Sequence, residues 1–407
     1  TSSGSTADNW GNTACADEEG NLYGVGTVFA RQSASSGIYD LNGFPATFGA
    51  FQTDFSGDIG AFGSNRFSDL AIMKLSPDGK QLIYATYLGG RECDVPTSSI
   101  VDKDGNLIIL AVTSSNNLPN PRNTFIGGDK AVFPSTYHYF PSGTDIAIIK
   151  LNKNGTDVIA SRYMGGSQMD GIMLAGEVVA GENFYWPLTN NYGDQFRGDV
   201  NLDDDGNIYV GSTTLSTDFP VVNAYQEANA GLLDAVAFKL SPDLDSLQWS
   251  TYLGGSDFDA CYSIFRDTAR NVFISGGTVS LDFPVTDSAI NKTNQGGVDG
   301  FVARIHKDGD SLIASTYLGT DRFDQAYFVQ SDTNNNAYIL GQTKGQYLPT
   351  SGAYSVTNGG HFIHKLSPML DSTFFVSTFG SDNPDPNTII PNISPTAFLV
   401  NECQNMF

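Results

Sequence analysis

A phrase of the form K-L-x-x-x-G-x-x-L-x-x-x-T-Y-L-G-G recurs along this 407-residue chain, and no other feature restricts its possible folds so strongly. The five copies end at Gly90, Gly166, Gly255, Thr320 and Ser381, with insertions between some of them. Self-similarity of this kind indicates a repeat architecture, in which each unit buries its apolar face against the next one. The chain is therefore predicted to be a series of similar units.

A second phrase precedes each copy of the first, and a sixth copy of it lies at the C-terminal end. Its copies, of the type D-D-D-G-N-I-Y-V-G-S-T, occur in segments that begin at Cys15, Ile100, Val200, Ile264, Val329 and Phe398. A third, weaker phrase of the type D-F-P-x-x-x-A lies between the two, in segments that begin at Gly43, Asp218, Asp282 and Tyr347. The constant order of the phrases defines one repeat unit.

Each unit contains four short runs that have the near-two period of half-buried strands and are rich in Ile, Val, Tyr and Phe. Asx-Gly steps between these runs accept the positive φ angles of tight hairpin turns, and they end at Gly79, Gly105, Gly155, Gly206 and Gly309. No amphipathic run suggests a long helix. Four antiparallel strands per unit, repeated five times, predict an all-β fold: a β-propeller of four-stranded antiparallel blades.

The units predict a single propeller domain over residues 1–407. Five full repeats fall at about 8–90, 91–166, 167–255, 256–320 and 321–381, and a partial sixth falls at 382–407. Because closure of a propeller removes exposed sheet edges, we expect six or seven blades in the closed disc. The sixth unit stops within a strand-like run, so we expect the chain to be a fragment of a longer polypeptide.

The charge of the chain excludes several classes of partner. Asp and Glu number 44 against 21 Lys and Arg, a formal net charge of -23. Nucleic acid and anionic membrane surfaces both require an excess of basic residues. No stretch approaches the roughly 20 apolar residues of a membrane span. We therefore expect neither nucleic-acid binding nor membrane insertion.

The N-terminus and the cysteines bear on the compartment. The chain starts at Thr1 in a small polar stretch without Met, which indicates a mature or excised fragment that has lost its targeting signal. Four cysteines are too few for a disulfide framework, although an oxidising compartment would allow one or two bridges among Cys15, Cys93, Cys261 and Cys403. The predicted localisation is extracellular, at the cell surface.

The phrases D-F-P-x-x-x-A-x-Q, G-G-x-x-D-A-x-x-x-K-L and S-T-Y-L-G-G resemble the bacterial SBBP β-propeller repeat over nearly the whole chain. The resemblance implies a very large secreted surface protein of gliding Bacteroidota, many of which are exported by a type IX system. It implies an extracellular structural or adhesive role and transfers no catalytic residue to this chain. The chain departs from the repeat through insertions at about 27–65 and 171–198, and the second unit lacks the third phrase.

Signals for catalysis are weak. The HExxH, GxSxG and P-loop patterns are absent from the sequence, and no pair among the many carboxylates is singled out for acid–base chemistry. His361 and His364 are three residues apart, so on a strand they face opposite sides and form a poor metal pair. We expect a protein that is not an enzyme and that needs no cofactor.

The string Asn201-x-Asp203-x-Asp205-Gly206 is the sharpest metal-like pattern, because alternate oxygen side chains before a glycine turn can surround a Ca²⁺ ion. The closing carboxylate of such a loop is missing, since Ser212 occupies its position. Equivalent Asx-rich loops in the other units favour an ordinary hairpin turn. A calcium site at Asn201, Asp203 and Asp205 is the alternative.

Aromatic residues in two insertions are candidates for contact with a sugar or a protein, because such side chains supply large contact areas. These interaction candidates are Tyr137, Tyr139, Phe140, Phe184, Tyr185 and Trp186. Packing of each insertion onto its own blade is the alternative interpretation.

Together these patterns predict a non-catalytic module of a large secreted cell-surface protein, acting in adhesion or in assembly of a surface filament. Its expected partners are other protein domains, copies of itself or surface glycans. A calcium-dependent, lectin-like propeller and, after it, a propeller enzyme that acts on glycans are the alternatives.

Overall fold

The structure is a computed structural model of the chain. It describes residues 9–29, 31–32, 39–40, 44–57, 67–119, 125–127, 143–173, 178–179, 182–183, 187–191, 193–380, 385, 389–401 and 403–407. These residues form 25 strands and one 3-10 helix of three residues, η1 (Asp194–Phe196). The prediction of an all-β fold is confirmed.

Five sheets, each built on four antiparallel strands, form the body of the protein. Blade 1 contains β1 (Asn9–Ala16), β2 (Leu22–Phe29), β5 (Ser68–Leu75) and β6 (Leu82–Leu88). Blade 2 contains β7 (Asp94–Val101), β8 (Leu107–Thr113), β10 (Asp145–Leu151) and β11 (Val158–Gly165). Blade 3 contains β14 (Asp199–Leu202), β15 (Ile208–Thr214), β16 (Asp234–Leu240) and β17 (Leu247–Leu253).

Blade 4 contains β18 (Asp259–Arg266), β19 (Val272–Thr278), β20 (Asp299–Ile305) and β21 (Leu312–Leu318). Blade 5 contains β22 (Asp324–Ser331), β23 (Ala337–Thr343), β24 (His361–Leu366) and β25 (Thr373–Phe379). Two small hairpins pair β3 (Arg31–Gln32) with β4 (Tyr39–Asp40), and β12 (Val178–Val179) with β13 (Glu182–Asn183). Each four-stranded sheet falls within one predicted repeat unit.

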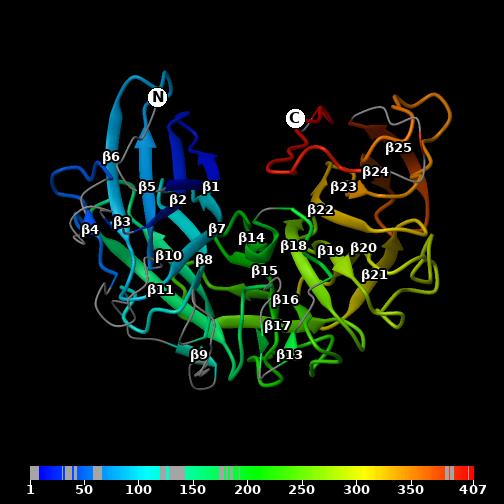
Figure 1. Cartoon of the computed structure of the whole chain (residues 1–407), viewed down its shortest axis with the longest axis horizontal. Helices are drawn as coiled ribbons and strands as arrows, with labels where there is room; N and C mark the ends of the chain where they lie inside the picture. The colour runs from blue at the N-terminus through cyan, green and yellow to red at the C-terminus, as the bar shows by residue number, and fades with distance from the viewer. Residues whose placement is uncertain are drawn as a thin grey trace.

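The blades follow one another around an arc, which is open between blade 1 and the C-terminal segment (Figure 1). A beginning of the sixth unit is present, because Phe398 and Val400 pack on Tyr338 and Leu340 of blade 5. Val400 forms a single antiparallel bridge with Met406. The prediction of propeller blades is confirmed, whereas the closed disc of six or seven blades stays a prediction.

Apolar side chains fill each space between neighbouring blades. Between blades 1 and 2, for example, Val25 and Ile72 pack in one cluster with Ile109 and Ile149. The period of two along each strand places alternate side chains on the two faces of the sheet. A blade with a neighbour on both sides, as blades 2, 3 and 4 have, therefore buries both of its faces. Burial of this kind explains why most strands are apolar over nearly their full length.

The loop between the second and third strands of a blade covers the outer edge of that same blade. In blade 3, Val222 and Ser250 exchange backbone hydrogen bonds of 3.2 and 2.8 Å across this edge. Blade 2 lacks the third phrase, and β9 (Phe125–Gly127) instead pairs in parallel with β11. Covered edges do not offer an open ladder to other chains.

A tyrosine hydroxyl links the first and third phrases, which explains why they recur together. The Tyr252 hydroxyl donates to the Ser216 carbonyl at 2.8 Å and accepts the N–H of Phe219 at 2.9 Å. Tyr317 makes the equivalent pair of bonds with Ser280 and Phe283. Each tyrosine is buried, as expected for a side chain that packs within the blade assembly.

The paired glycines of the first phrase are required by close packing. A Cβ on Gly254 would lie 2.5 Å from Oδ1 of Asp234 and 3.0 Å from Oδ2 of Asp259. The next glycine, Gly255, donates its N–H to Oδ2 of Asp259 at 2.7 Å, which joins blade 3 to the first strand of blade 4. Two carboxyl groups therefore meet at one glycine at the junction of two blades.

Large and small side chains alternate across the junctions between blades. Trp249 of blade 3 lies against the turn of blade 4, where a Cβ on Gly309 would be 2.6 Å from its Cγ. Tyr84 of blade 1 occupies the same place over Gly155 of blade 2. Both glycines have left-handed φ angles, of 81° and 71°.

The other two junctions carry the reverse pairing. In blades 2 and 4, Ala160 and Ala314 occupy the positions equivalent to the aromatic residues of blades 1 and 3. These alanines share apolar clusters with Leu244 and Leu370 of the next blades. Both leucines adopt the left-handed conformation, with φ of 62° and 55°, which is unfavourable for a leucine. Burial of their side chains in the space that the alanines leave accounts for leucine at a position suited to glycine.

This pairing predicts a rescue between two substitutions. Gly309→Leu should destabilise the protein by about 1–3 kcal/mol, because the leucine would overlap Trp249. The double variant Gly309→Leu/Trp249→Ala should be more stable than Trp249→Ala alone, since it recreates the Ala314–Leu370 pair. Urea unfolding of the four proteins measures this coupling, and additive effects would contradict it.

Candidate functional site

The innermost strands of four blades carry an irregularity at the same place. The register of β1, β7, β18 and β22 shifts by one residue against the second strand of the blade. The residues left unpaired are Asn12, Thr97, Tyr262 and Tyr327. A β-bulge leaves its extra residue outside the ladder and can redirect a side chain toward a functional site. Three residue types, Asn, Thr and Tyr, occupy these four positions, so the side chains presented near the axis are not the same in every blade.

The segment before blade 3 lies against these bulges. Within it, the fully buried Asp194 of η1 accepts the backbone N–H groups of Asn190 and Asn191 at 2.8 and 2.6 Å. The same carboxylate accepts the Tyr327 hydroxyl at 2.8 Å, and Nε and Nη2 of Arg197 at 3.2 and 3.1 Å. Asp194 therefore ties a segment of the third unit to a strand of blade 5.

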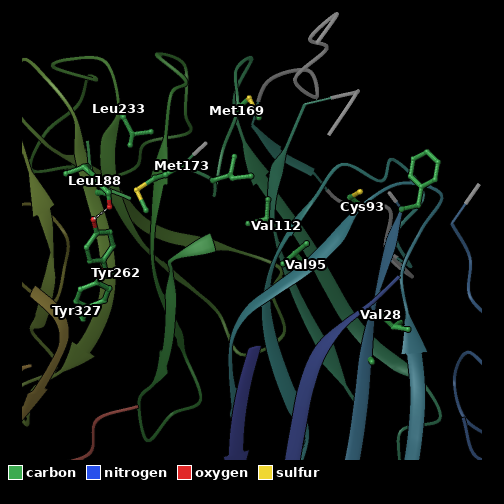
Figure 2. Close-up of a cluster of buried hydrophobic side chains, with 14 of the residues drawn as sticks. Val28, Cys93, Val95, Val112, Met169, Met173, Leu188, Leu233, Tyr262 and Tyr327 are labelled. Atoms are coloured by element: carbon green, nitrogen blue, oxygen red, sulfur yellow. Dashed lines mark hydrogen bonds between the residues drawn. The ribbon is translucent and has the colours of Figure 1, made fainter. Parts of the chain in front are cut away.

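Amide and hydroxyl groups extend this contact into a buried polar network. Nε2 of Gln325 donates to the Leu188 carbonyl at 2.6 Å and to the Tyr262 hydroxyl at 2.7 Å. Gln342 donates to Oε1 of Gln325 at 2.9 Å. Figure 2 shows Tyr262 bonded to Leu188, with the Tyr327 ring beside it at a centroid distance of 5.4 Å. Satisfied networks of this kind hold a segment in one position.

The tyrosines of the network act as neutral donors. Burial, followed by the charge of Asp194, raises the pKa of both Tyr262 and Tyr327 well above the usual value. Arg197 lies over the Tyr327 ring, with its Cζ 4.6 Å from the centroid. Because a phenol of raised pKa keeps its proton, these side chains support structure, and a tyrosinate nucleophile is not favoured here.

A pocket of about 210 Å³ lies at the axis beside this network. It is bordered by the bulged parts of the inner strands, the η1 segment and residues 394–396. Among its lining residues are Asn12, Thr13, Thr97, Ser98, Phe196, Arg197, Asp199, Tyr262, Phe328 and Thr396. Concave sites with aromatic walls and a few converging polar groups are the usual places for small ligands.

Asp199 forms one side of the pocket. Its Oδ1 accepts the Ser98 hydroxyl and its Oδ2 accepts the Ser263 hydroxyl, both at 2.8 Å. Burial raises the pKa of this carboxyl against the opposing effect of these hydrogen bonds. Asp199 thus connects the inner strands of blades 2, 3 and 4 around the pocket.

The predicted calcium residues lie in the first hairpin turn of blade 3, away from the axial pocket. Oδ1 of Asp203 accepts the N–H groups of Asp205 and Asn207, at 3.0 and 2.9 Å. Its Oδ2 accepts the Tyr209 hydroxyl at 3.1 Å and pairs with Nζ of Lys239 at 3.5 Å. Burial alone would raise the pKa of Asp203, but these bonds and the ammonium group lower it. A metal ion at Asp203 would therefore have to compete with the ammonium group of Lys239 for this carboxylate.

The other two predicted ligands face different partners. Oδ2 of Asp205 pairs with Arg270 at 2.5 Å, and Oδ1 of Asn201 accepts the N–H of Arg266 at 3.5 Å. Within the described ranges, no group of three or more His, Cys, Asp or Glu residues is placed to hold a metal ion. The arrangement favours the hairpin turn, and the calcium site stays a prediction.

The same turn recurs in every blade, which explains the Asx-rich second phrase. A buried Asp accepts the N–H of an Asn four residues later and pairs with a cation from the third strand. In blade 1, burial raises the pKa of Asp17, but Asn21 and Lys74 lower it further, to about 2. The pattern that suggested calcium is therefore a fold determinant.

Other sequence candidates contribute nothing to the axial pocket. The aromatic candidates Tyr137, Tyr139, Phe140, Phe184, Tyr185 and Trp186 lie outside the described residues. His361 accepts the N–H of Ile393, whereas His364 contacts Tyr347 and Thr373, so the two histidines have separate partners. The four cysteines, all of them among the described residues, form no disulfide. In the described part of the chain, no helix has the length and apolarity needed to cross a membrane.

Sequence reasoning missed Asp194, Arg197 and the four bulged residues. Two signals could have indicated them. The insertion at about 171–198 interrupts the repeat immediately before blade 3, and the bulge positions carry three residue types, Asn, Thr and Tyr, in four units. Variation within a repeat is a sign of function, because the packing role is the same in each unit.

No protein-family model matches the chain, and no curated protein matches it. Solved structures similar to it include a protein of unknown function from Dyadobacter fermentans, with 11% identity, a TM-score of 0.43 and coverage of 93% of this chain and 84% of that one. A luciferin-regenerating enzyme has 11% identity, a TM-score of 0.31 and coverage of 81% and 83%. NanB sialidase from Streptococcus pneumoniae has 9% identity, a TM-score of 0.40 and coverage of 84% and 53%.

These structures correct one prediction. The expectation that the chain is not an enzyme is wrong, because the structures similar to it include two enzymes. The weakness of catalytic motifs did not justify that conclusion. Similarities at these identities and TM-scores assign no activity to this chain, since a propeller fold carries many functions.

Proposed function

We propose that this chain is an interaction module of a secreted cell-surface protein and that it binds its partner at the axial pocket. The observation that carries the proposal is the convergence of four β-bulges on that pocket. A bulge interrupts backbone pairing, and its recurrence beside one cavity is most simply explained by a binding role. The resemblance to the SBBP repeat supports a role in adhesion or surface-filament assembly.

The blade edges support binding at the axis over binding at the periphery. The outer strands are already paired with loops of their own blade, or with β9 in blade 2. A partner chain could add a strand there only by displacing those segments. The net charge of -23 further favours partners that are neutral or basic over anionic polymers.

The proposal is tested with the purified chain on intact bacterial cells and on immobilised surface glycans, by biolayer interferometry. Thr97→Trp would fill the axial pocket, and we expect it to weaken binding at least about tenfold. Thr217→Trp makes the same change on an exposed loop outside the pocket and should leave binding unchanged. Equal binding by the two variants, or no binding by the parent chain, would refute the proposal.

A further inference from the structure

We infer that the axial pocket accepts a single uncharged sugar ring, an inference that rests on the proposed binding function of this pocket. Its volume of about 210 Å³ lies below the roughly 300–1,000 Å³ of sites for drug-sized ligands. The space therefore suits one six-membered ring. A longer glycan would enter with one terminal residue.

The charges around the pocket disfavour an anionic ligand, because Asp199 is an acidic lining residue and the charge of Arg197 is already balanced. Arg197 is the one cation among the described lining residues, and its guanidinium already contacts Asp194 through Nε and Nη2. Nη2 also donates to the Pro395 carbonyl at 3.3 Å. Since Asp194 balances the charge of Arg197, a carboxylate or phosphate ligand would lack an uncompensated cation.

The polar atoms of the pocket match hydroxyl groups. Thr27 donates to Oδ1 of Asn12 at 3.1 Å, so the amide N–H groups of Asn12 are the atoms that can donate to a ligand. The hydroxyls of Thr97 and Ser98 donate to the Leu110 carbonyl and to Asp199, and their oxygens keep lone pairs that can accept. A mixed set of donors and acceptors suits groups that do both, as sugar hydroxyls do.

Two aromatic side chains supply the apolar part of the site. Phe196 from η1 and Phe328 from β22 both line the pocket and are half-buried, so part of each ring stays accessible. The C–H face of a pyranose is apolar and packs on such rings, while its hydroxyls point to the rim. An apolar wall facing polar groups distinguishes a sugar from a wholly polar ligand such as an inorganic anion.

The test is a titration of the full chain with free monosaccharides, followed by saturation-transfer NMR and calorimetry. The panel contains glucose, galactose, mannose, N-acetylglucosamine and rhamnose, with glucuronic acid and sialic acid as charged counterparts. We expect at least one neutral sugar to bind with a millimolar Kd and the acidic sugars to bind at least about tenfold more weakly.

Asn12→Ala and Phe328→Ala should each weaken that binding at least about fivefold, and Thr217→Trp should not change it. Asn12 is exposed, so its variant should fold even if Phe328→Ala unfolds the protein, which a thermal melt would reveal. If no neutral sugar binds, or an acidic sugar or a short peptide binds more tightly, the inference is wrong. If no sugar binds while cell binding still depends on Thr97, the inference fails and the proposed function stands.

Discussion

Replacing Asp267 with alanine should destabilise the protein by about 3–5 kcal/mol, because it would leave the buried Arg304 without its partner. The Asp267 side chain is fully buried, and Oδ2 accepts both Nε and Nη2 of Arg304. The same carboxylate holds the hairpin turn by accepting the N–H groups of Ala269 and Asn271 at 2.8 and 2.9 Å. Chemical unfolding of the variant and the parent measures the loss.

A matched control lies on the surface of the neighbouring blade. Asp204 pairs with Arg266 at 2.7 Å, but its side chain is 77% exposed, so Asp204→Ala should cost less than about 1 kcal/mol. Combining Asp267→Ala with Arg304→Met should recover part of the stability lost in Asp267→Ala, because the unpaired buried charge is removed. Similar losses for Asp267→Ala and Asp204→Ala would show that burial does not govern these ion pairs.

The protein should lose several kcal/mol of stability as the pH rises from about 5 to 8, because a carboxyl group whose pKa is higher by one in the folded than in the unfolded chain contributes about 1.4 kcal/mol. Burial raises the pKa of the junction carboxyls, to about 6 for Asp324, about 7 for Asp234, Asp259 and Asp299, and about 8 for Asp69. The folded protein thus keeps protons that the unfolded chain releases near pH 4. This stabilisation is fully present below about pH 4 and is lost as the pH rises through about 6 to 8.

The turn carboxylates act in the opposite direction at lower pH. Hydrogen bonds and lysine neighbours lower the pKa of Asp17, Asp102, Asp203 and Asp332, against the effect of burial. Their contribution is present above about pH 4 and is lost as the pH falls below it. We therefore expect maximal stability near pH 4, at roughly the unfolded pKa of an aspartate, measured by thermal melts in a single buffer series.

Two isosteric substitutions identify the groups responsible. In the described structure, Oδ1 of Asp234 and Oδ1 of Asp299 are buried without a hydrogen-bond partner, as suits a protonated carboxyl group. Burial raises the pKa of Asp234, and the nearby charge of Asp282 adds to that effect. The double variant Asp234→Asn/Asp299→Asn should flatten the loss of stability between about pH 4 and 7, whereas Asp104→Asn on an exposed turn should not. An unchanged slope would contradict this assignment.

Much of the fold could be predicted from the sequence because its determinants are local and repeated. The near-two period and the Asx-Gly turns are properties of short segments, so they indicated four strands per unit before any contact was known. Gly105 and Gly206 adopt the left-handed φ angles that their turns required. The departure of the second unit was also visible in the sequence, whereas its consequence, the parallel strand β9, was not.

The candidate site could not be predicted in the same way, because it joins residues from distant units. Asp194 and Tyr327 are 133 positions apart and meet only after five blades have been arranged around one axis. The calcium hypothesis pointed to a different place, because it considered only the spacing of oxygen-bearing side chains within one loop. Asp203 faces Lys239 of a strand that the local pattern did not include.

The sequence by itself determined the blade, since strand period, turn chemistry and the order of phrases act within a few residues of one another. Tertiary structure decided which side chains occupy the spaces between blades and around the axis. Leucine at Leu370 and glycine at Gly309 occupy equivalent turns, and only the side chain on the preceding blade, Ala314 or Trp249, explains the difference. The space between two blades is filled by side chains from segments far apart in the chain, so the sequence of one segment alone does not show how that space is filled.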